Sequence, residues 1–285
     1  MKLRSLLFVP GDRPERMEKA MGLGADALLF DLEDSVAADR KAEARENVAQ
    51  FLRERSDRAE QGAPRLFVRI NPLDGPWAQG DLAQVMPAGP DGLVLPKCES
   101  ADTVAALMTL IPEDQRVPVL PIASETPAAI FGMGTYASCA AHLAGVTWGA
   151  EDLPAAIGAS TSREADGSYT PPYQLARSLT LFAAHAAGVP AVETVYPAIK
   201  DLDGLAAYAA RGARDGFTGM MAIHPSQIAV INDAFTPSEE EIAHARSVVA
   251  AFAANPGVGA LQLDGKMIDA PHLRQAQALL ARANC

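Results

Sequence analysis

Acidic residues gather at the end of the apolar stretch LLFDLEDSVA, where Asp31, Glu33 and Asp34 follow a short hydrophobic run. Carboxylates repel one another and resist leaving water, so bringing three together in a folding unit is costly unless something offsets their charge. Two further acids, Glu125 and Asp152, each follow another apolar run. Two carboxylates, completed by waters and substrate oxygens, are the usual protein ligands of Mg²⁺. The pattern therefore predicts a magnesium site at Glu125 and Asp152.

The elements that must position these acids are short apolar runs, each bounded by Gly, Pro or charge, as buried parallel strands are. Eight are expected, at residues 5–11, 26–34, 65–71, 92–97, 118–124, 145–152, 189–195 and 219–225. Helix-like segments separate them. Eight strand–helix alternations in roughly 230 residues predict a (β/α)₈ TIM barrel. A doubly wound open sheet is the alternative, but VPGDRPER, after the first strand, has no G-x-G-x-x-G.

A barrel places its active site at the carboxyl ends of its strands. The residues at those ends are Asp31, Glu33, Asp34, Arg69, Asn71, Lys97, Glu125, Glu151, Asp152, Glu193 and His224. We expect them to converge on one mouth, where the cations offset the acids. Alternatively they are helix caps, as expected for Thr126 with Pro127 behind it. Capping favours acids, so Arg69 and Lys97 argue for a site, although Arg69 can also pair with the acids of the second strand.

Composition narrows the class of protein. The 285 residues are 49% hydrophobic and 21% charged, which is typical of a globular protein with one large domain or a domain with an appendage. A net charge of −11 argues against nucleic acid as a partner. Three cysteines without metal spacing indicate a reducing compartment, and no apolar run is long enough for a signal peptide or a membrane span. We expect a cytoplasmic protein.

Longer motifs carry a family resemblance. RSLLFVPGDRPERMEKA, DALLFDLEDSVAADRKAEAR, VRINP, LPK, ETP, WGAEDL and AIHPSQ resemble the citrate lyase beta-subunit-like branch of the HpcH/HpaI aldolase family, from residue 4 to about 283. The resemblance implies a Mg²⁺-dependent barrel that makes or breaks a carbon–carbon bond between an acyl thioester and a 2-oxo acid. By motif, Glu125 and Asp152 resemble the metal ligands, and Arg69 resembles the substrate-binding arginine. Glu33 and Asp34 resemble the acids that order Arg69 and the waters of the metal.

If the substrate is a CoA thioester, basic residues near the mouth of the barrel are candidates for binding its phosphates. Arg13, Arg16 and Lys19 follow the first strand, and Arg16 and Lys19 share a helix face. We expect them to meet the CoA phosphates, and we count Lys97 of the LPK motif with the substrate-binding residues. The alternative is a solvated helix face on which these cations pair with the neighbouring glutamates.

The chain continues beyond the last expected strand, so we divide it into a barrel, 1–235, and a helical extension, 236–285. TPSEEEIAHARSVVAAFAANPG predicts a helix with a capping box at Thr236 and Glu239. The chain then turns through Gly265 and presents Asp269 before a last helix, where spacing alone makes Asp269 an N-cap. GKMIDAPHLRQAQALL resembles the C-terminal segment of malyl- and citramalyl-CoA lyases. There this aspartate, usually delivered by a neighbouring subunit, moves the proton at the thioester α-carbon.

The expected protein is a homo-oligomeric lyase, with a trimer or a multiple of three subunits. It would cleave a 3-hydroxy-3-carboxyacyl-CoA (malyl-, β-methylmalyl- or citramalyl-CoA) into an acyl-CoA and a 2-oxo acid. The group that takes the hydroxyl proton stays open among a metal-bound water, Glu33 and Asp34. A malyl-CoA thioesterase and a carrier-protein-dependent citrate lyase beta subunit are the alternatives.

Overall fold

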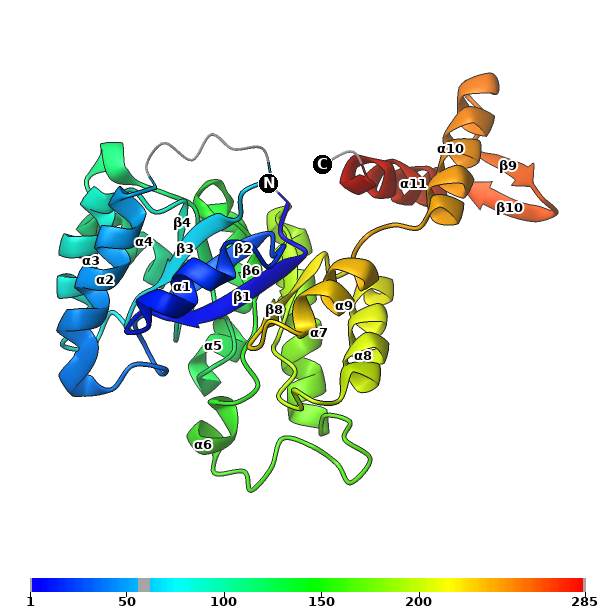
Figure 1. The fold of residues 1–285 in the computed structure, drawn as a ribbon. Helices are drawn as coiled ribbons and strands as arrows, with labels where there is room; N and C mark the ends of the chain where they lie inside the picture. Colours follow the sequence, from blue (N-terminus) through cyan, green and yellow to red (C-terminus); the bar gives the residue numbers. More distant parts are fainter. Residues whose placement is uncertain (1, 56–61, 284–285) are drawn as a thin grey trace. The chain divides into compact units, whose positions relative to one another are not determined.

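The structure is a computed structural model that describes residues 2–55 and 62–283. The chain divides into two compact units, one formed by Leu3–Asn232 and the other beginning at Asp233 (Figure 1). The first carries the eight expected strands and the second carries a small helical fold.

The first unit is a TIM barrel, as predicted. Its strands are β1 (Ser5–Pro10), β2 (Ala27–Asp31), β3 (Arg65–Arg69), β4 (Gly92–Leu95), β5 (Val119–Pro121), β6 (Val146–Thr147), β7 (Ala191–Glu193) and β8 (Gly219–Ala222). All neighbouring pairs are parallel, and β1 pairs with both β2 and β8, which a doubly wound sheet would not allow. Between β5 and β6 the ring is joined by isolated bridges, Val119 to Leu143 and Ile122 to Thr147, in place of a paired ladder.

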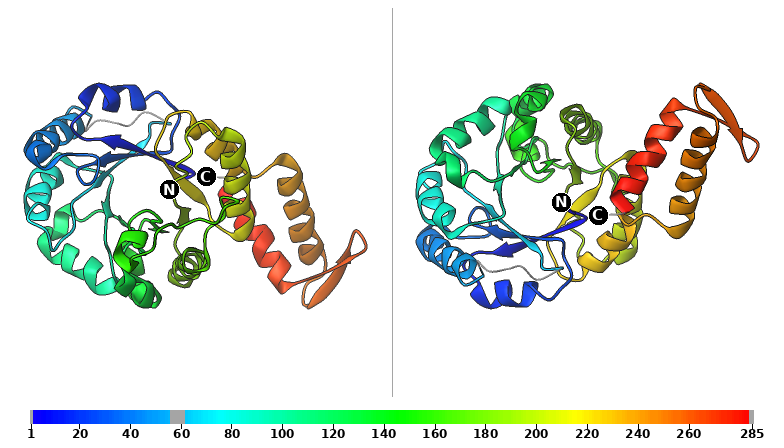
Figure 2. Two further views of the ribbon diagram at one scale, coloured as in Figure 1. Left: turned by 90° about the horizontal axis from the view of Figure 1, so that it is seen from below. Right: turned by 90° about the horizontal axis from the view of Figure 1, so that it is seen from above.

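Helices surround the strands of this unit (Figure 2). They are α1 (Pro14–Ala20), α2 (Lys41–Arg53), α3 (Ala78–Val85), α4 (Ala101–Leu110), α5 (Pro127–Gly132), α6 (Leu153–Ile157), α7 (Pro171–Ala187), α8 (Leu202–Asp215) and α9 (Gln227–Ala234). Short 3₁₀ segments lie at Ala38–Arg40, Met86–Ala88, Glu113–Gln115 and Met133–His142. The predicted cap of α5 is confirmed, because the Thr126 hydroxyl accepts a hydrogen bond from the backbone N–H of Ala129.

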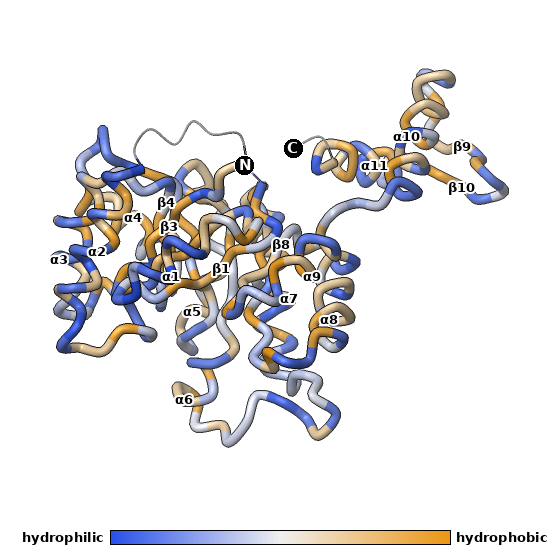
Figure 3. The backbone as a smooth tube through the Cα atoms, in the orientation of Figure 1, coloured by the Kyte–Doolittle hydropathy of each residue, from blue (hydrophilic) through white to orange (hydrophobic). Residues whose placement is uncertain are grey.

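Apolar side chains fill the barrel. Leu6, Leu29, Phe67, Val94 and Leu120, from five successive strands, are fully buried in one cluster. The strands are hydrophobic on both faces because the helices cover the outside, and hydrophobic stretches recur along the tube in Figure 3. This packed interior leaves only the strand ends free to carry polar chemistry.

The second unit contains α10 (Glu239–Ala254), the hairpin β9 (Ala260–Leu263) and β10 (Lys266–Asp269), and α11 (Ala270–Ala283). The predicted capping box at Thr236 and Glu239 is wrong. The box is formed by Ser238 and Glu241, where the hydroxyl accepts from Glu241 N at 3.1 Å and the carboxylate accepts from Ser238 N at 2.8 Å. This start places three glutamates in the first turn, where the helix dipole favours them.

The hairpin turns at Asp264 and Gly265, both with positive φ, 48° and 76°. Asp-Gly is a strong hairpin signal that the sequence prediction did not use, although it placed the turn at Gly265. The core of this unit contains Ile268 and Ala276, with Leu279 and Leu280 packed against it. Much of the apolar face of α11 is therefore covered within its own unit.

No helix in the part of the chain that the structure describes has the length and hydropathy needed to cross a bilayer. Cys98 and Cys139 are buried free thiols, and burial raises the pKa of Cys98 to about 12. The third cysteine, Cys285, lies outside the described residues.

Candidate active site

A cavity of about 800 Å³ opens at the carboxyl ends of the barrel strands. Among the residues that line it are Asp31, Asp34, Arg69, Glu125, Glu151, Asp152, His224, Arg16 and Lys19. The expected convergence of polar groups from several strands on one mouth is therefore present for this set.

Arg69 is a largely enclosed cation that lines this cavity. It is clamped by Asp31, with Nε–Oδ1 at 2.7 Å and Nη2–Oδ2 at 2.8 Å, and its Nη1 lies 2.8 Å from Glu33 and 3.6 Å from Asp34. Burial raises the pKa of Asp31, but the Arg69 charge and hydrogen bonds to the carboxylate outweigh it and hold that pKa below its usual value. Arg69 thus pairs with the acids of strand two and also lines the cavity.

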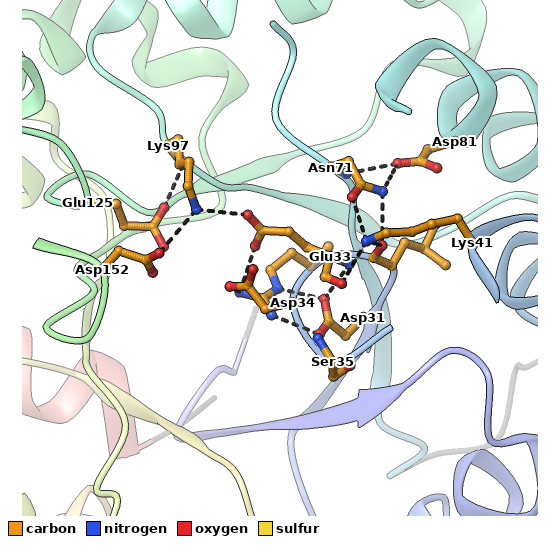
Figure 4. A network of polar contacts seen from close by, with 12 residues as sticks. Asp31, Glu33, Asp34, Ser35, Lys41, Asn71, Asp81, Lys97, Glu125 and Asp152 are labelled. Carbon is orange, nitrogen blue, oxygen red and sulfur yellow. Dashed lines mark hydrogen bonds and ion pairs between the residues drawn. The ribbon is translucent and has the colours of Figure 1, made fainter. Parts of the chain in front are cut away.

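Lys97 lies between Glu33 on one side and Glu125 and Asp152 on the other (Figure 4). We call these acids, with Asp31 and Asp34, the acid cluster. Its backbone φ is 48°, a left-handed conformation that is uncommon for a non-glycine residue and is often found at functional sites. Its N–H donates to Glu125 Oε2 at 2.5 Å, and its ammonium lies 3.0 Å from Glu33 Oε1 and 3.3 Å from Asp152 Oδ1. One residue therefore contacts three carboxylates.

Glu125 is almost completely buried, and burial raises its pKa to about 8, with the nearby charges of Glu33 and Asp152 adding to the effect and hydrogen bonding to Lys97 opposing it. Burial likewise raises the pKa of Glu33, although Arg69 opposes the shift. In both groups burial is the largest cause of the raised pKa.

This donor set fits a hard divalent cation. Glu125 and Asp152 both line the cavity, and both contact Lys97, Glu125 through the backbone N–H and Asp152 through the ammonium. Within residues 2–55 and 62–283 no cluster of three or more His, Cys, Asp or Glu is arranged to hold a metal, so a cation here would be completed by waters or substrate oxygens. That is the coordination typical of Mg²⁺.

Four of the predicted strand-end residues, Glu33, Asn71, Lys97 and Glu193, are not among the residues that line the cavity. Two of these four are enclosed by neighbouring elements. Glu193 is fully buried and accepts hydrogen bonds from Trp148 Nε1 at 2.5 Å and Arg177 Nε at 2.6 Å. Asn71 is buried beside Lys41. Both side chains hold neighbouring elements together, Glu193 through Trp148 and Arg177, and Asn71 through Lys41 and Asp81.

The two cations within α1 line the cavity, whereas Arg13, which directly precedes the helix, does not. Arg16 and Lys19 line the cavity, as predicted. Arg13 is not among the lining residues and lies 3.6 Å from Asp12. Glu18, a possible partner of the cavity-lining pair, binds Arg55 at 2.5 Å.

Asp269 belongs to the second unit, at the end of β10 directly before α11. Its Oδ1 lies 2.6 Å from Nδ1 of His272, and its backbone N–H faces the same nitrogen at 3.2 Å. The contact with His272, three residues on, holds the carboxylate at the start of the helix.

Sequence reasoning missed a buried group behind the acid cluster, Lys41 with Asn71 and Asp81. A signal for it existed. Lys41 lies at helical spacing from Ala44 and Val48 on the apolar face of α2, where a lysine must find partners.

Comparison with known proteins agrees with this site. Residues 4–225 match the family model described as HpcH/HpaI aldolase/citrate lyase, and residues 177–285 match one described as a carbon–carbon bond lyase of the TIM-barrel fold. The chain is 37% identical to a (3S)-malyl-CoA thioesterase of Cereibacter sphaeroides, covering 98% of this chain and 94% of that protein. It is 38% identical to a citrate lyase subunit beta-like protein of Mycobacterium tuberculosis, covering 97% and 94%.

Among solved structures, the CitE protein of Mycobacterium tuberculosis in complex with magnesium, acetoacetate and coenzyme A superimposes with a TM-score of 0.80. The two are 36% identical, and the match covers 99% of this chain and 98% of that one. The magnesium of this relative agrees with the predicted cofactor. The chain belongs to the HpcH/HpaI aldolase/citrate lyase family and is an enzyme of its carbon–carbon lyase type.

Proposed function

We propose that this protein is a Mg²⁺-dependent lyase that cleaves a 3-hydroxy-3-carboxyacyl-CoA into an acyl-CoA and a 2-oxo acid. The observation that carries the proposal is the grouping of Glu125 and Asp152 with Arg69 in one cavity that α1 borders with two cations. Malyl-, β-methylmalyl- and citramalyl-CoA are the candidate substrates.

Glu125 and Asp152 would hold the magnesium ion, which supplies Lewis-acid chemistry to the carboxylate and hydroxyl of the substrate when bound. Arg69 balances negative charge at the reacting oxygens, and the Asp31 clamp fixes its direction. Lys97 is not among the lining residues, so its proposed part is to offset the charge of Glu33 and Asp152 rather than to contact the substrate directly.

Of the two acids proposed to take the hydroxyl proton, Asp34 lines the cavity and Glu33 is not among the lining residues. We assign the proton to the Asp34 carboxylate, and to Glu33 the orientation of Arg69 and Lys97. Cleavage of the carbon–carbon bond leaves an acyl-CoA enolate, whose α-carbon takes a proton from Asp269. We further propose that this aspartate comes from a neighbouring subunit of a homo-oligomer, with a trimer expected.

Arg16 and Lys19 would bind the CoA phosphates, because they supply positive charge at the border of the cavity on a chain with a net charge of −11. The relative whose structure contains both magnesium and coenzyme A supports CoA as part of the ligand.

A thioesterase is the second candidate, favoured by the malyl-CoA thioesterases among the relatives. The same cavity would then admit water to the thioester carbonyl. The experiment that separates the two is product analysis with purified protein, Mg²⁺ and the three thioesters. A lyase releases the oxo acid and an acyl-CoA, whereas a thioesterase releases malate or its methyl homologue and free CoA.

The citrate lyase beta subunit of Escherichia coli, 35% identical, marks a third possibility, a subunit that depends on a carrier protein. Turnover of free CoA thioesters by the isolated protein would contradict it. Failure of all three free thioesters, with turnover of a carrier-bound substrate, would overturn the proposed function.

A further inference from the structure

The ammonium group of Lys41, the first residue of α2, is buried beneath the segment that carries Glu33 and Asp34. It donates to the carbonyl oxygens of Leu32 and Glu33, each at 2.7 Å, and to Asn71 Oδ1 at 2.8 Å. These three bonds use all three donors of the ammonium. Lys41 is not among the cavity-lining residues, so it acts from behind the site.

A second layer holds the acceptor of Lys41 in place. The side-chain amide of Asn71 donates to Leu32 O at 2.9 Å and to Asp81 Oδ2 at 2.7 Å, and its backbone N–H donates to the same oxygen at 2.8 Å. The other carboxylate oxygen of Asp81 accepts from Arg45 Nε at 2.6 Å. Asp81 is fully buried, so the whole chain of contacts is shielded from water.

The opposite side of the same segment is held by Asp31, which accepts from Glu33 N at 2.9 Å and Ser35 N at 3.0 Å. The peptide groups around Glu33 are therefore fixed on both sides, with the amide bound to Asp31 and the carbonyl bound to Lys41 (Figure 4). From this backbone the Glu33 side chain reaches Arg69 and Lys97.

Packing alone gives no reason for a lysine at this position. A buried ammonium loses its hydration, and burial lowers the pKa of Lys41, although Asp31 and Asp81 oppose the shift. A methionine would fill similar space on the apolar face of α2 without that cost. The ammonium adds direction, because two of its hydrogen bonds fix two consecutive carbonyl groups and the third binds Asn71.

We propose that Lys41 is a positioning residue for the reaction, acting through the carbonyls of Leu32 and Glu33 to fix the Glu33 carboxylate and, through it, Arg69. The inference rests on the proposed function, since it assigns Arg69 to the reacting oxygens. Supporting residues of this kind typically change activity by about 10- to 100-fold when removed.

Lys41→Met tests the proposal, because it keeps length and apolar volume and removes all three donors. We expect kcat to fall about 10- to 100-fold, while KM for the thioester and the affinity for Mg²⁺ change by less than about threefold. Hydrogen exchange of the amides in residues 31–36 should become faster. The number of competent sites is measured by the stoichiometry of Mg²⁺ binding, so that misfolded protein is not counted.

Arg4→Met is the matched control. Arg4 precedes β1 at the amino end of the strands and binds Asp26 at 2.9 Å, so its loss removes a partly buried ion pair away from the cavity. This variant should lose stability with kcat and the exchange of residues 31–36 unchanged. If Lys41→Met retains the kcat of the original protein, or if Arg4→Met reproduces its loss of kcat, the proposal is wrong.

Should Lys41→Met fail to fold, Asn71→Ala carries the test, because it removes one acceptor of Lys41 and one donor to Leu32. The same split between kcat and KM is expected, and a normal kcat overturns the inference. A protein that turns over none of the substrates contradicts the proposed function instead, and the exchange of residues 31–36 then still tests whether Lys41 fixes the segment.

Discussion

Arg69 and Asp31 occupy facing positions at the ends of two adjacent parallel strands, and their side chains form two hydrogen bonds, of 2.7 and 2.8 Å. The two oxygens of the carboxylate match the fork of the guanidinium, which fixes its plane as well as its position. The remaining nitrogen, Nη1, is left to face Glu33 and Asp34. Asp31 therefore sets the direction of the Arg69 guanidinium.

From this clamp we expect Arg69→Lys to lower kcat/KM by about 10²–10³, because a lysine keeps the charge but loses the fork. Steady-state kinetics on the preferred thioester measures the effect. Arg65→Lys, on the same strand but exposed beside Asp91, is the control and should keep normal kinetics. A loss smaller than about threefold in Arg69→Lys would show that the bidentate geometry has no role in the reaction.

The metal site gives a second prediction. Glu125→Ala or Asp152→Ala should reduce Mg²⁺ binding and lower activity by orders of magnitude, since each variant leaves one carboxylate where two are needed. Isothermal titration with Mg²⁺ and activity assays measure both effects, with Glu54→Ala on the exposed end of α2 as the control. Full activity after thorough chelation would sink the magnesium hypothesis.

The raised pKa of Glu125, about 8, gives a pH dependence. At neutral pH the metal-free carboxyl holds a proton that Mg²⁺ must displace, so apparent affinity should rise up to about tenfold per pH unit below 8 and level off above it. Calorimetry in two buffers of different ionisation enthalpy should show close to one proton released at low pH and almost none well above pH 8. Equal proton release at both pH values would contradict this.

The raised pKa of Glu125 lowers the stability of the metal-free fold as pH rises, whereas it makes Mg²⁺ binding stronger as pH rises. A carboxyl whose pKa is raised in the folded state binds its proton more tightly than the unfolded chain does. Its stabilising contribution is present below about pH 4.5 and is lost as pH rises through about 8.

The cavity-lining cations of α1 give a fourth prediction. Charge reversal in the double variant Arg16→Glu and Lys19→Glu should raise KM for the CoA thioester at least about tenfold, equivalent to about 1.4 kcal/mol. KM for a pantetheine thioester that lacks the phosphates should stay unchanged. Arg13→Glu is the control, because Arg13 pairs with Asp12 and is not among the lining residues. An unchanged KM in the double variant would exclude Arg16 and Lys19 from CoA binding.

The fifth prediction concerns Asp269. Asp269→Ala should lose about 10²–10⁴ of the lyase rate, the usual size of a proton-transfer contribution. If the aspartate acts across a subunit interface, mixing this inactive variant with inactive Glu125→Ala should restore activity once subunits exchange. No recovery despite proven exchange would mean that Asp269 serves its own barrel, and a normal rate in Asp269→Ala would leave it with the helix-start role alone.

The barrel and most of the cavity were predictable because buried parallel strands leave a strong signature of short apolar runs, and Asp31, Arg69 and Glu125 follow such runs directly. The direction of each end residue was not predictable, because it depends on partners from distant segments: Asn71 lies only two residues after Arg69 but is buried against Asp81. Glu193 and Asn71 therefore looked equivalent to Glu125 in the sequence but point into packed surroundings.

Local patterns were ambiguous where two registers fit equally well. Thr236 with Glu239 and Ser238 with Glu241 both satisfy the capping-box spacing, and only the second forms. The partners of Lys41 come from residues 32, 33 and 71, so its role depends on contacts between distant segments that spacing along one helix does not reveal.

The junction between β5 and β6 gives the proposed cation a mechanical consequence. This is the place where isolated bridges replace a continuous ladder, and Glu125 follows β5 while Asp152 follows β6. An ion bound by both carboxylates would link the segments that follow β5 and β6, where the strands are connected by isolated bridges. Metal binding would then raise the free energy of separating β5 from β6, so the ion needed for the reaction would also stabilise the barrel.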